Sequence, residues 1–223
     1  MIRLVSLCFA LAVLIASTAC VQTRLDGPNH SADGPAWVAE GAGDEIAPFE
    51  IQRRVVLIGD TGLYLETDPV LDALAHWTRS GPPSTVVFLG DNLYDEGLQD
   101  EDRERGEKIL RQQIEATPAQ QVFVPGNHDW GLSPDGQDPK VLRNQQEFVL
   151  GFDHVEFSPR DGCMGPTTIE LDQAPGERGV ALVLMDPTKW LYPTLNSGCP
   201  KEQTKEEFLA ALRATLTAHS DDW

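Results

Sequence analysis

Basic residues are scarce in this chain. Its 223 residues include 17 lysines and arginines against 35 aspartates and glutamates, which gives a formal net charge of −18 at pH 7. An acidic surface of this kind repels the phosphates of nucleic acids and anionic membranes, so the sequence predicts no nucleic-acid partner. Any anionic ligand would need bound cations to supply positive charge at its site.

Cysteines are also few, and glycine-rich nucleotide-binding loops are absent. Cys163 and Cys199 are the only cysteines beyond residue 20, and neither has a Cys or His at the spacing of a zinc site. In an exported protein two such cysteines often pair, so we predict a Cys163–Cys199 disulfide. No Gly-x-Gly-x-x-Gly follows the first predicted strand, which argues against a dinucleotide-binding oxidoreductase.

The chain opens with an apolar leader. Residues 4–16 are almost entirely apolar, and Arg3 is the only charge in residues 1–20. The apolar part is too short to favour a stable membrane span, so residues 1–20 are predicted to be a signal peptide. Small residues before Cys20 resemble a bacterial lipobox, which predicts export to the bacterial cell envelope and a lipid anchor at Cys20. Ordinary cleavage near Ala19, giving a soluble exported protein, is the alternative.

A linker and a folded body follow the leader. Residues 21–50 hold Gly, Pro, Asp, Ala and Asn with little periodicity, which is typical of a flexible linker. Residues 51–223 are enough for one domain with a sizeable core. Within this body, residues 167–171 and 180–185 are predicted to be strands of a hairpin or of a second sheet.

Three short apolar runs between residues 55 and 124 each end in a compact polar motif. Residues 55–58, 86–89 and 122–124 have the composition of buried strands in a parallel sheet. The intervening segments are long enough for crossover helices, so we predict a β-α-β-α-β unit. Ligands of such sheets bind beyond the carboxyl ends of the strands. The side chains expected to converge there are Asp60, Asp91, Tyr94, Asn127 and His128.

Helices are predicted around these strands. Asp68-Pro69 is a typical helix start, and Trp77 or Thr78 is expected on the buried face of that helix. Residues 95–111 carry many charges of both signs, which favours a solvated helix face with internal ion pairs. Asp138-Pro139 is expected to start a further helix.

The five converging side chains suit a metal centre. Carboxylate and amide oxygens, a phenolate and an imidazole nitrogen together suit cations such as iron, manganese or zinc. A central aspartate can bridge two metals roughly 3.5–4 Å apart, which is the spacing of two-metal hydrolytic sites. The alternative is a Rossmann-like sheet whose loop aspartates only cap helices.

The motifs Asp60-x-Gly62, Gly90-Asp91-x-x-Tyr94 and Gly126-Asn127-His128-Asp129 together resemble the first half of the calcineurin-like metallophosphoesterases. They are most similar to the purple acid phosphatase branch, in which glycine replaces the histidine of Asp-x-His and a tyrosine follows the second aspartate. The resemblance implies an α/β fold, the αββα sandwich of that family.

This resemblance also implies the roles of the candidate residues. Asp60 and Tyr94 would ligate the first metal, Asp91 would bridge, and Asn127 would ligate the second. His128 would lie near the substrate oxygens and the leaving group. The implied reaction is hydrolysis of a phosphate ester with two divalent or trivalent metal ions, iron paired with iron, zinc or manganese.

The later ligands of that family have no counterpart in this chain. The family supplies a single histidine and then a Gly-His-x-His pair, whereas this chain contains no His-x-His. Residues 51–223 are therefore expected to be the N-terminal portion of the phosphoesterase domain, incomplete at the C-terminus, with too few ligands to hold two metals firmly. A non-catalytic exported lipoprotein or binding module that retains the fold is the alternative function.

Overall fold

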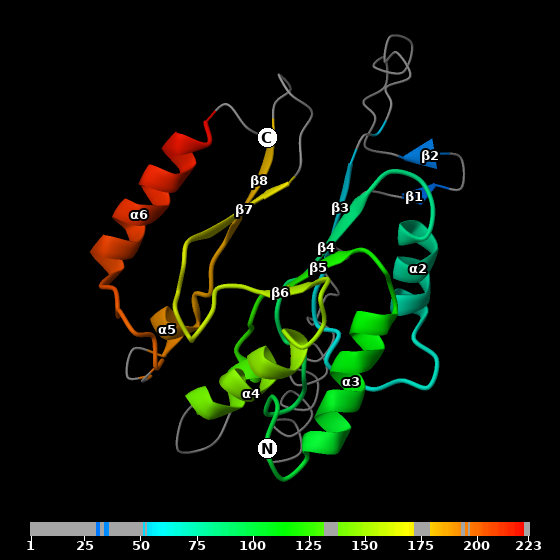
Figure 1. Cartoon of the computed structure of the whole chain (residues 1–223), viewed down its shortest axis with the longest axis horizontal. Helices are drawn as coiled ribbons and strands as arrows, with labels where there is room; N and C mark the ends of the chain where they lie inside the picture. Colours follow the sequence, from blue (N-terminus) through cyan, green and yellow to red (C-terminus); the bar gives the residue numbers. More distant parts are fainter. Residues whose placement is uncertain are drawn as a thin grey trace, which may run out of the picture. The chain divides into compact units, whose positions relative to one another are not determined.

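The computed structural model describes residues 30–31, 34–35, 51, 53–131, 138–171, 179–192, 195 and 197–220 (Figure 1). It divides the chain into two compact units, Met1–Glu50 and Ile51–Trp223. In the first unit, β1 (His30–Ser31) and β2 (Gly34–Pro35) pair antiparallel. The predicted signal peptide, Cys20 and most of the predicted linker lie outside the described residues. Within the part of the chain that is described, no helix is both long and apolar enough to cross a membrane.

A four-stranded parallel sheet forms the centre of the second unit. In spatial order its strands are β3 (Arg54–Ile58), β4 (Ser84–Phe88), β5 (Gln120–Phe123) and β6 (Val155–Phe157). The three strands predicted from the sequence are confirmed. The fourth strand, β6, is absent from the prediction because three residues are too few for a strand pattern to be recognised.

Alternate residues of the central strands face opposite sides of this sheet. Phe88 and Phe123 stack with ring centroids 4.4 Å apart, in the same core as the helices. Val87 and Val122 belong to a separate apolar cluster that includes Leu184 of the second sheet. The period of two expected of a strand therefore divides the core into two layers.

Three helices cover the first side of the sheet: α2 (Pro69–Thr78), α3 (Arg103–Glu115) and α4 (Pro139–Val149). Helices α2 and α4 begin at the predicted Asp-Pro pairs, where Asp68 and Asp138 accept hydrogen bonds from amides of the first turn. Thr78 is half-buried. Trp77 was the other residue predicted for the buried face. Its side chain is 61% exposed, so the prediction is wrong for Trp77.

A second sheet packs against the other side. The predicted hairpin is confirmed as β7 (Thr167–Leu171) paired antiparallel with β8 (Val180–Leu184). Two helices follow, α5 (Thr188–Leu191) and α6 (Lys205–Ala218), and α6 lies beyond the second sheet in Figure 1. The body thus has helix, sheet, sheet and helix layers, which is the predicted α/β fold of the αββα type.

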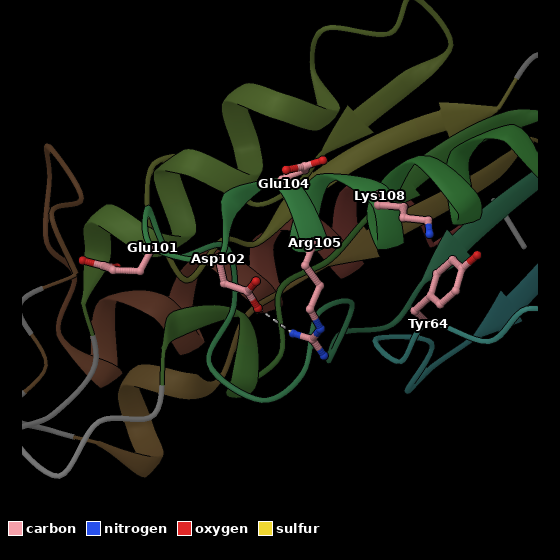
Figure 2. A pocket seen from close by; sticks show the side chains of 6 residues that line it. All are labelled: Tyr64, Glu101, Asp102, Glu104, Arg105 and Lys108. Carbon is pink, nitrogen blue, oxygen red and sulfur yellow. Dashed lines mark hydrogen bonds and ion pairs between the residues drawn. The ribbon is translucent and has the colours of Figure 1, made fainter.

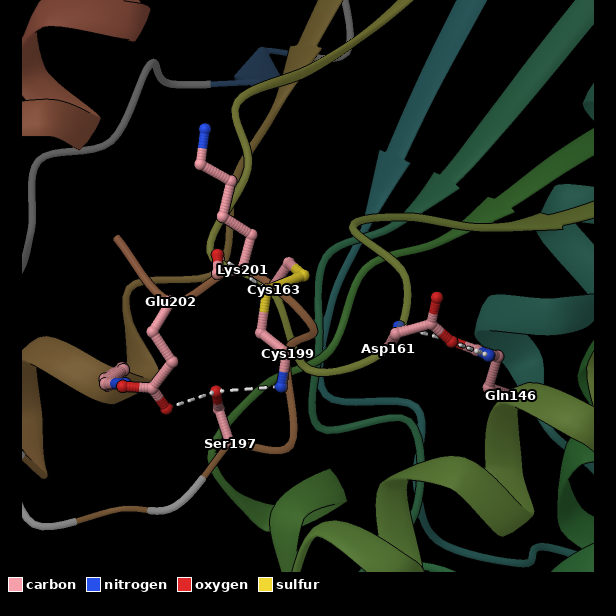
Figure 3. Close-up of a disulfide and its surroundings, with 8 residues drawn as sticks. Gln146, Asp161, Cys163, Ser197, Cys199, Lys201 and Glu202 are labelled. Atoms are coloured by element: carbon pink, nitrogen blue, oxygen red, sulfur yellow. Dashed lines mark hydrogen bonds and ion pairs between the residues drawn. A yellow bond between two sulfur atoms is a disulfide. The ribbon is translucent and has the colours of Figure 1, made fainter. Parts of the chain in front are cut away.

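The predicted disulfide joins the loops that precede β7 and α6. Cys163 and Cys199 are bonded, with their Cα atoms 4.8 Å apart. Beside them the amide of Cys199 donates to Ser197 Oγ at 3.2 Å (Figure 3). Gly162 packs against the Ser197 carbonyl so closely that a β-carbon there would lie 2.1 Å from the oxygen. The cross-link therefore lies within a tight backbone contact.

Candidate metal centre

The loops that follow β3 and β4 meet at the carboxyl end of the parallel sheet. The amide of Asp60 donates to the carbonyl oxygen of Gly90 at 3.2 Å. The Tyr94 hydroxyl donates to Asp60 Oδ1 at 2.6 Å and lies 3.2 Å from Asp91 Oδ2. Three of the side chains predicted from the sequence therefore converge on one point.

The loop after β5 reaches the same point. The His128 amide donates to Asp91 Oδ1 at 3.1 Å, and the His128 and Tyr94 rings meet edge to face at 4.5 Å between centroids. His128 Nδ1 lies 2.6 Å from the carbonyl oxygen of Asp95. Because a carbonyl oxygen only accepts, Nδ1 carries a proton, which leaves Nε2 free to accept in the neutral ring.

Asn127 lies beside this cluster because it directly precedes His128 in the sequence. It is half-buried and lies at the start of the short helix η1 (His128–Trp130), between Gly126 and His128. Its side chain forms no hydrogen bond with any residue that the structure describes. The structure thus joins Asp60, Asp91, Tyr94 and His128 by direct contacts, whereas Asn127 is only adjacent.

Both aspartates have backbone conformations that side chains rarely adopt. The φ angles of Asp60 and Asp91 are 58° and 52°. Left-handed φ values in residues other than glycine are uncommon and concentrate at functional sites. Close backbone packing surrounds Asp91, since a β-carbon at Gly126 would lie 2.4 Å from Asp91 Oδ1. A β-carbon at Gly90, where φ is 103°, would lie 2.7 Å from the Gly126 Cα.

Gly62 is required by the loop that carries Tyr94. A β-carbon at this position would lie 2.7 Å from the carbonyl oxygen of Asp91 and from the backbone nitrogens of Leu93 and Tyr94. The Tyr94 amide donates to the Gly62 carbonyl at 3.0 Å. A histidine at position 62 would therefore displace the loop of Tyr94, which gives a steric reason for the occurrence of Gly62 together with Tyr94.

Asp129 binds the second and third loops together. Its buried carboxylate accepts from the Gly126 amide at 2.7 Å, the Asn92 amide at 3.0 Å and Asn92 Nδ2 at 3.1 Å. Burial raises the pKa of Asp129 to about 7, although these hydrogen bonds oppose the shift. The sequence motif does not predict this inward orientation. The only signal for it is the position of Asp129 beside Trp130, a large apolar residue.

The pKa of Tyr94 is raised above that of a free tyrosine. The main cause is the hydrogen bond that its hydroxyl donates to Asp60, followed by burial and by the negative charge of Asp91. The two carboxylates therefore keep the phenol protonated when no cation is present to oppose their charge.

The oxygen donors of this cluster fit a hard cation. Two carboxylates and a hydroxyl already lie within hydrogen-bonding distance of one another, and such ligands suit iron, manganese or magnesium. Among the described residues, no group of three or more His, Cys, Asp or Glu side chains could hold a metal. The charged oxygen donors that join here are the carboxylates of Asp60 and Asp91, beside the Tyr94 hydroxyl.

A hollow of about 470 Å³ adjoins the loop of Tyr94. Arg105 donates to the Tyr94 carbonyl at 3.3 Å and pairs with Asp102 at 3.1 Å. Figure 2 shows Lys108 pointing toward Tyr64, with its ammonium 4.0 Å from the ring centroid. Within α3, Arg103 pairs with Glu107, which confirms the predicted internal ion pairs for residues 103–111. Residues 95–102 are loop, so the predicted helix face is wrong for that part.

A family model described as calcineurin-like phosphoesterase matches residues 53–178, which is more than half of the 223 residues and includes all five candidate residues. A solved structure, phosphopantetheinyl hydrolase (PptH) from Mycobacterium tuberculosis, is similar over 74% of this chain at 16% sequence identity and a TM-score of 0.40. This chain covers 64% of the length of that structure. No curated protein matches the sequence.

Proposed function

Because this chain belongs to the calcineurin-like phosphoesterase family, whose members generally use divalent metal ions, we propose that it hydrolyses phosphate esters at a centre of two metals. In this proposal Asp60 and Tyr94 bind the first metal, Asp91 bridges and Asn127 binds the second. The observation that carries the proposal is the Tyr94 hydroxyl, which lies within 3.2 Å of carboxylate oxygens of both Asp60 and Asp91.

Each side chain has a distinct task in this proposal. Bound metals would polarise the phosphoryl oxygens and lower the pKa of a bound water. Asp60 and Asp91 supply the negative charge that holds cations in place. His128 keeps one ring nitrogen on the Asp95 carbonyl, so its orientation is fixed and Nε2 remains for a substrate or leaving-group oxygen.

We further propose that the centre is of the purple acid phosphatase type. The support is the steric coupling of Gly62 to the loop of Tyr94, since a histidine ligand at position 62 would displace the phenol. A phenolate oxygen is a hard anionic ligand, which favours trivalent iron at the first site. Iron, zinc or manganese would then occupy the second site.

The test measures hydrolysis and metal binding by the full chain. Because this chain contains no His-x-His pair, we expect metal binding to be weak, so release of p-nitrophenol from p-nitrophenyl phosphate is expected to be slow. It should require added iron, manganese or zinc in excess and stop with a chelator. With Fe³⁺ we expect a visible charge-transfer band that Tyr94→Phe abolishes and Tyr192→Phe leaves unchanged. Hydrolysis that persists without metal, or an iron band unaffected by Tyr94→Phe, would contradict the assignment.

The predicted export and lipid anchor at Cys20 remain part of this proposal. The Cys163–Cys199 disulfide supports export, because disulfides persist mainly in oxidising compartments. Incorporation of a labelled fatty acid in a bacterial host should be lost in Cys20→Ala. Equal labelling of the two proteins would contradict acylation at this residue.

A further inference from the structure

Gln113 binds two loops of the metal centre at once. It lies on α3 with its side chain fully buried, and its Nε2 donates to the Thr61 carbonyl at 2.9 Å and the Asn92 carbonyl at 2.8 Å. Both partners only accept, so the amide nitrogen must face them; the reversed amide would set Oε1 against two oxygens. Thr61 directly follows Asp60, and Asn92 directly follows Asp91.

These two bonds lie where the loop backbones are most constrained. Asp60 and Asp91, the neighbours of the two acceptors, have φ values of 58° and 52°. A strained backbone persists only when surrounding contacts fix it, and an unpaired buried carbonyl would be unfavourable. Gln113 supplies such a contact to both loops with one planar group, so it also sets the spacing between them.

Asn92 extends this connection to the third loop. Its carbonyl accepts from Gln113, its amide donates to Asp129, and its side chain donates to the Val124 carbonyl at 2.8 Å. Asp129 in turn accepts from the Gly126 amide. The loops after β3, β4 and β5 are therefore connected through buried hydrogen bonds that begin at Gln113.

We propose that Gln113 is a positioning residue of the metal centre, which holds the Asp60 and Asp91 carboxylates at the separation that cation binding requires. The proposal rests on the proposed function, because it assigns Gln113 to the same centre. Gln113 itself touches neither metal nor substrate. Its effect passes through the backbone of residues 61 and 92.

Gln121 offers a matched control. It is also fully buried, on β5, and its Nε2 also donates to two backbone carbonyls, those of Ile114 at 2.8 Å and Thr117 at 3.0 Å. Those acceptors lie at the end of α3 and just after it, not in a loop of the centre. Loss of either glutamine amide removes two equivalent buried hydrogen bonds. Only the loss at Gln113 releases the loops that carry Asp60 and Asp91.

The experiment compares Gln113→Met with Gln121→Met, since methionine is close to glutamine in size and cannot donate. Both variants are expected to lower the Tm by similar amounts. Only Gln113→Met should accelerate exchange of the Tyr94 amide, which bonds to Gly62 across the two loops, by about tenfold or more in NMR. It should also weaken Mn²⁺ affinity by about 10- to 100-fold, as loss of a residue that orients ligands does.

Gln113→Glu keeps the experiment informative if Gln113→Met does not fold. A protonated glutamate retains one donor for two carbonyls, so its Tyr94 amide should exchange faster, and its Mn²⁺ affinity should be lower, than in the wild type and in Gln121→Met. Equal changes in Tyr94 exchange for the Gln113 and Gln121 variants, or none in either, would overturn the proposal. Absence of Mn²⁺ binding in the wild type would instead overturn the proposed function, while the exchange comparison would still test Gln113.

Discussion

Two parts of the 51–223 unit are held together by different kinds of contact. At the carboxyl ends of β3, β4 and β5, Asn92, Gln113 and Asp129 each bind backbone groups of another segment through buried hydrogen bonds. Among the described residues between 158 and 220, the contacts outside the β7–β8 pair include the disulfide and Phe208, whose ring meets Trp190 edge-on at 4.8 Å between centroids.

The two kinds of contact are therefore expected to control different properties: the positions of the loops in one part and the stability of the folded protein in the other. Hydrogen bonds to loop carbonyls act on the native geometry, so their loss is expected to move the loops and the ligands they carry. A disulfide acts largely by restricting the unfolded chain, so its loss is expected to lower stability while the folded geometry is kept. Substitutions in the two parts should therefore change different measurements.

Removal of the disulfide is expected to have a large effect on stability. The bond closes a sequence separation of 36 residues. The loop-entropy relation gives a loss of about 3–4 kcal/mol in the free energy of unfolding for Cys163→Ser with Cys199→Ser. Urea denaturation followed by tryptophan fluorescence measures it, and the reduced wild type serves as the control. A parallel loss of metal affinity in the folded protein would show that the two parts are not separable.

Substitution of Asp91, the carboxylate proposed to bridge two metals, is expected to affect metal binding rather than stability. Asp91→Asn keeps the size of the side chain, and asparagine tolerates the φ of 52° found there. Metal affinity and phosphatase activity are expected to fall by more than about 100-fold, beyond the effect of losing a residue that only orients a ligand. The Tm should change little.

Asp161 provides the control for this substitution in the other part of the molecule. It also has a left-handed φ, of 57°, and it exchanges hydrogen bonds with Gln146 near the disulfide (Figure 3). Asp161→Asn is expected to leave metal affinity unchanged. If both variants bind metal as the wild type does, Asp91 is not a ligand.

Asp186 connects the two parts and should give a pH-dependent effect. Trp130 Nε1 donates to its carboxylate at 2.8 Å, and so does the Thr188 amide. Burial raises the pKa of Asp186, and the hydrogen bonds from Thr188 and Trp130 oppose the shift. As pH rises past the ordinary aspartate pKa of about 3.9, this carboxyl ionises in the unfolded chain before it ionises in the folded protein. The free energy of unfolding therefore decreases with pH until the raised pKa of the folded protein is passed.

The comparison with Asp186→Asn isolates this dependence. The amide does not titrate, and its Nδ2 cannot accept one of the two hydrogen bonds, so the variant should have the lower free energy of unfolding near pH 4. As pH rises, the free energy of unfolding of the wild type should fall relative to that of the variant. Denaturation curves at several pH values measure the difference between the two proteins, and a difference that does not change with pH would contradict the raised pKa.

The sequence predicted the parts of the fold and site that depend on local patterns. β-branched runs closed by glycine identified β3, β4 and β5, and the polar residues after them identified the cluster of Asp60, Asp91 and Tyr94. The role of Gln113 could not be predicted in this way. Its acceptors are 52 and 21 residues away in the chain, and only the folded structure brings them together.

Surface leucines of α6 should give the smallest effect. Leu209 and Leu216 share helix α6 with Phe208, but they are 46% and 55% exposed, whereas Phe208 is buried. The 3.6-residue pattern alone cannot show which apolar residues pack against other side chains.

Substitution of Leu209 or Leu216 by glutamine is therefore expected to change the free energy of unfolding by no more than about 0.5 kcal/mol. Leu110→Ala, in the buried core between the helices and the parallel sheet, should cost about 2–5 kcal/mol in the same urea assay. A loss of that size at Leu209 or Leu216 would mean that α6 packs more tightly than its exposure indicates, and that the second part of the molecule depends on apolar contacts beyond Phe208.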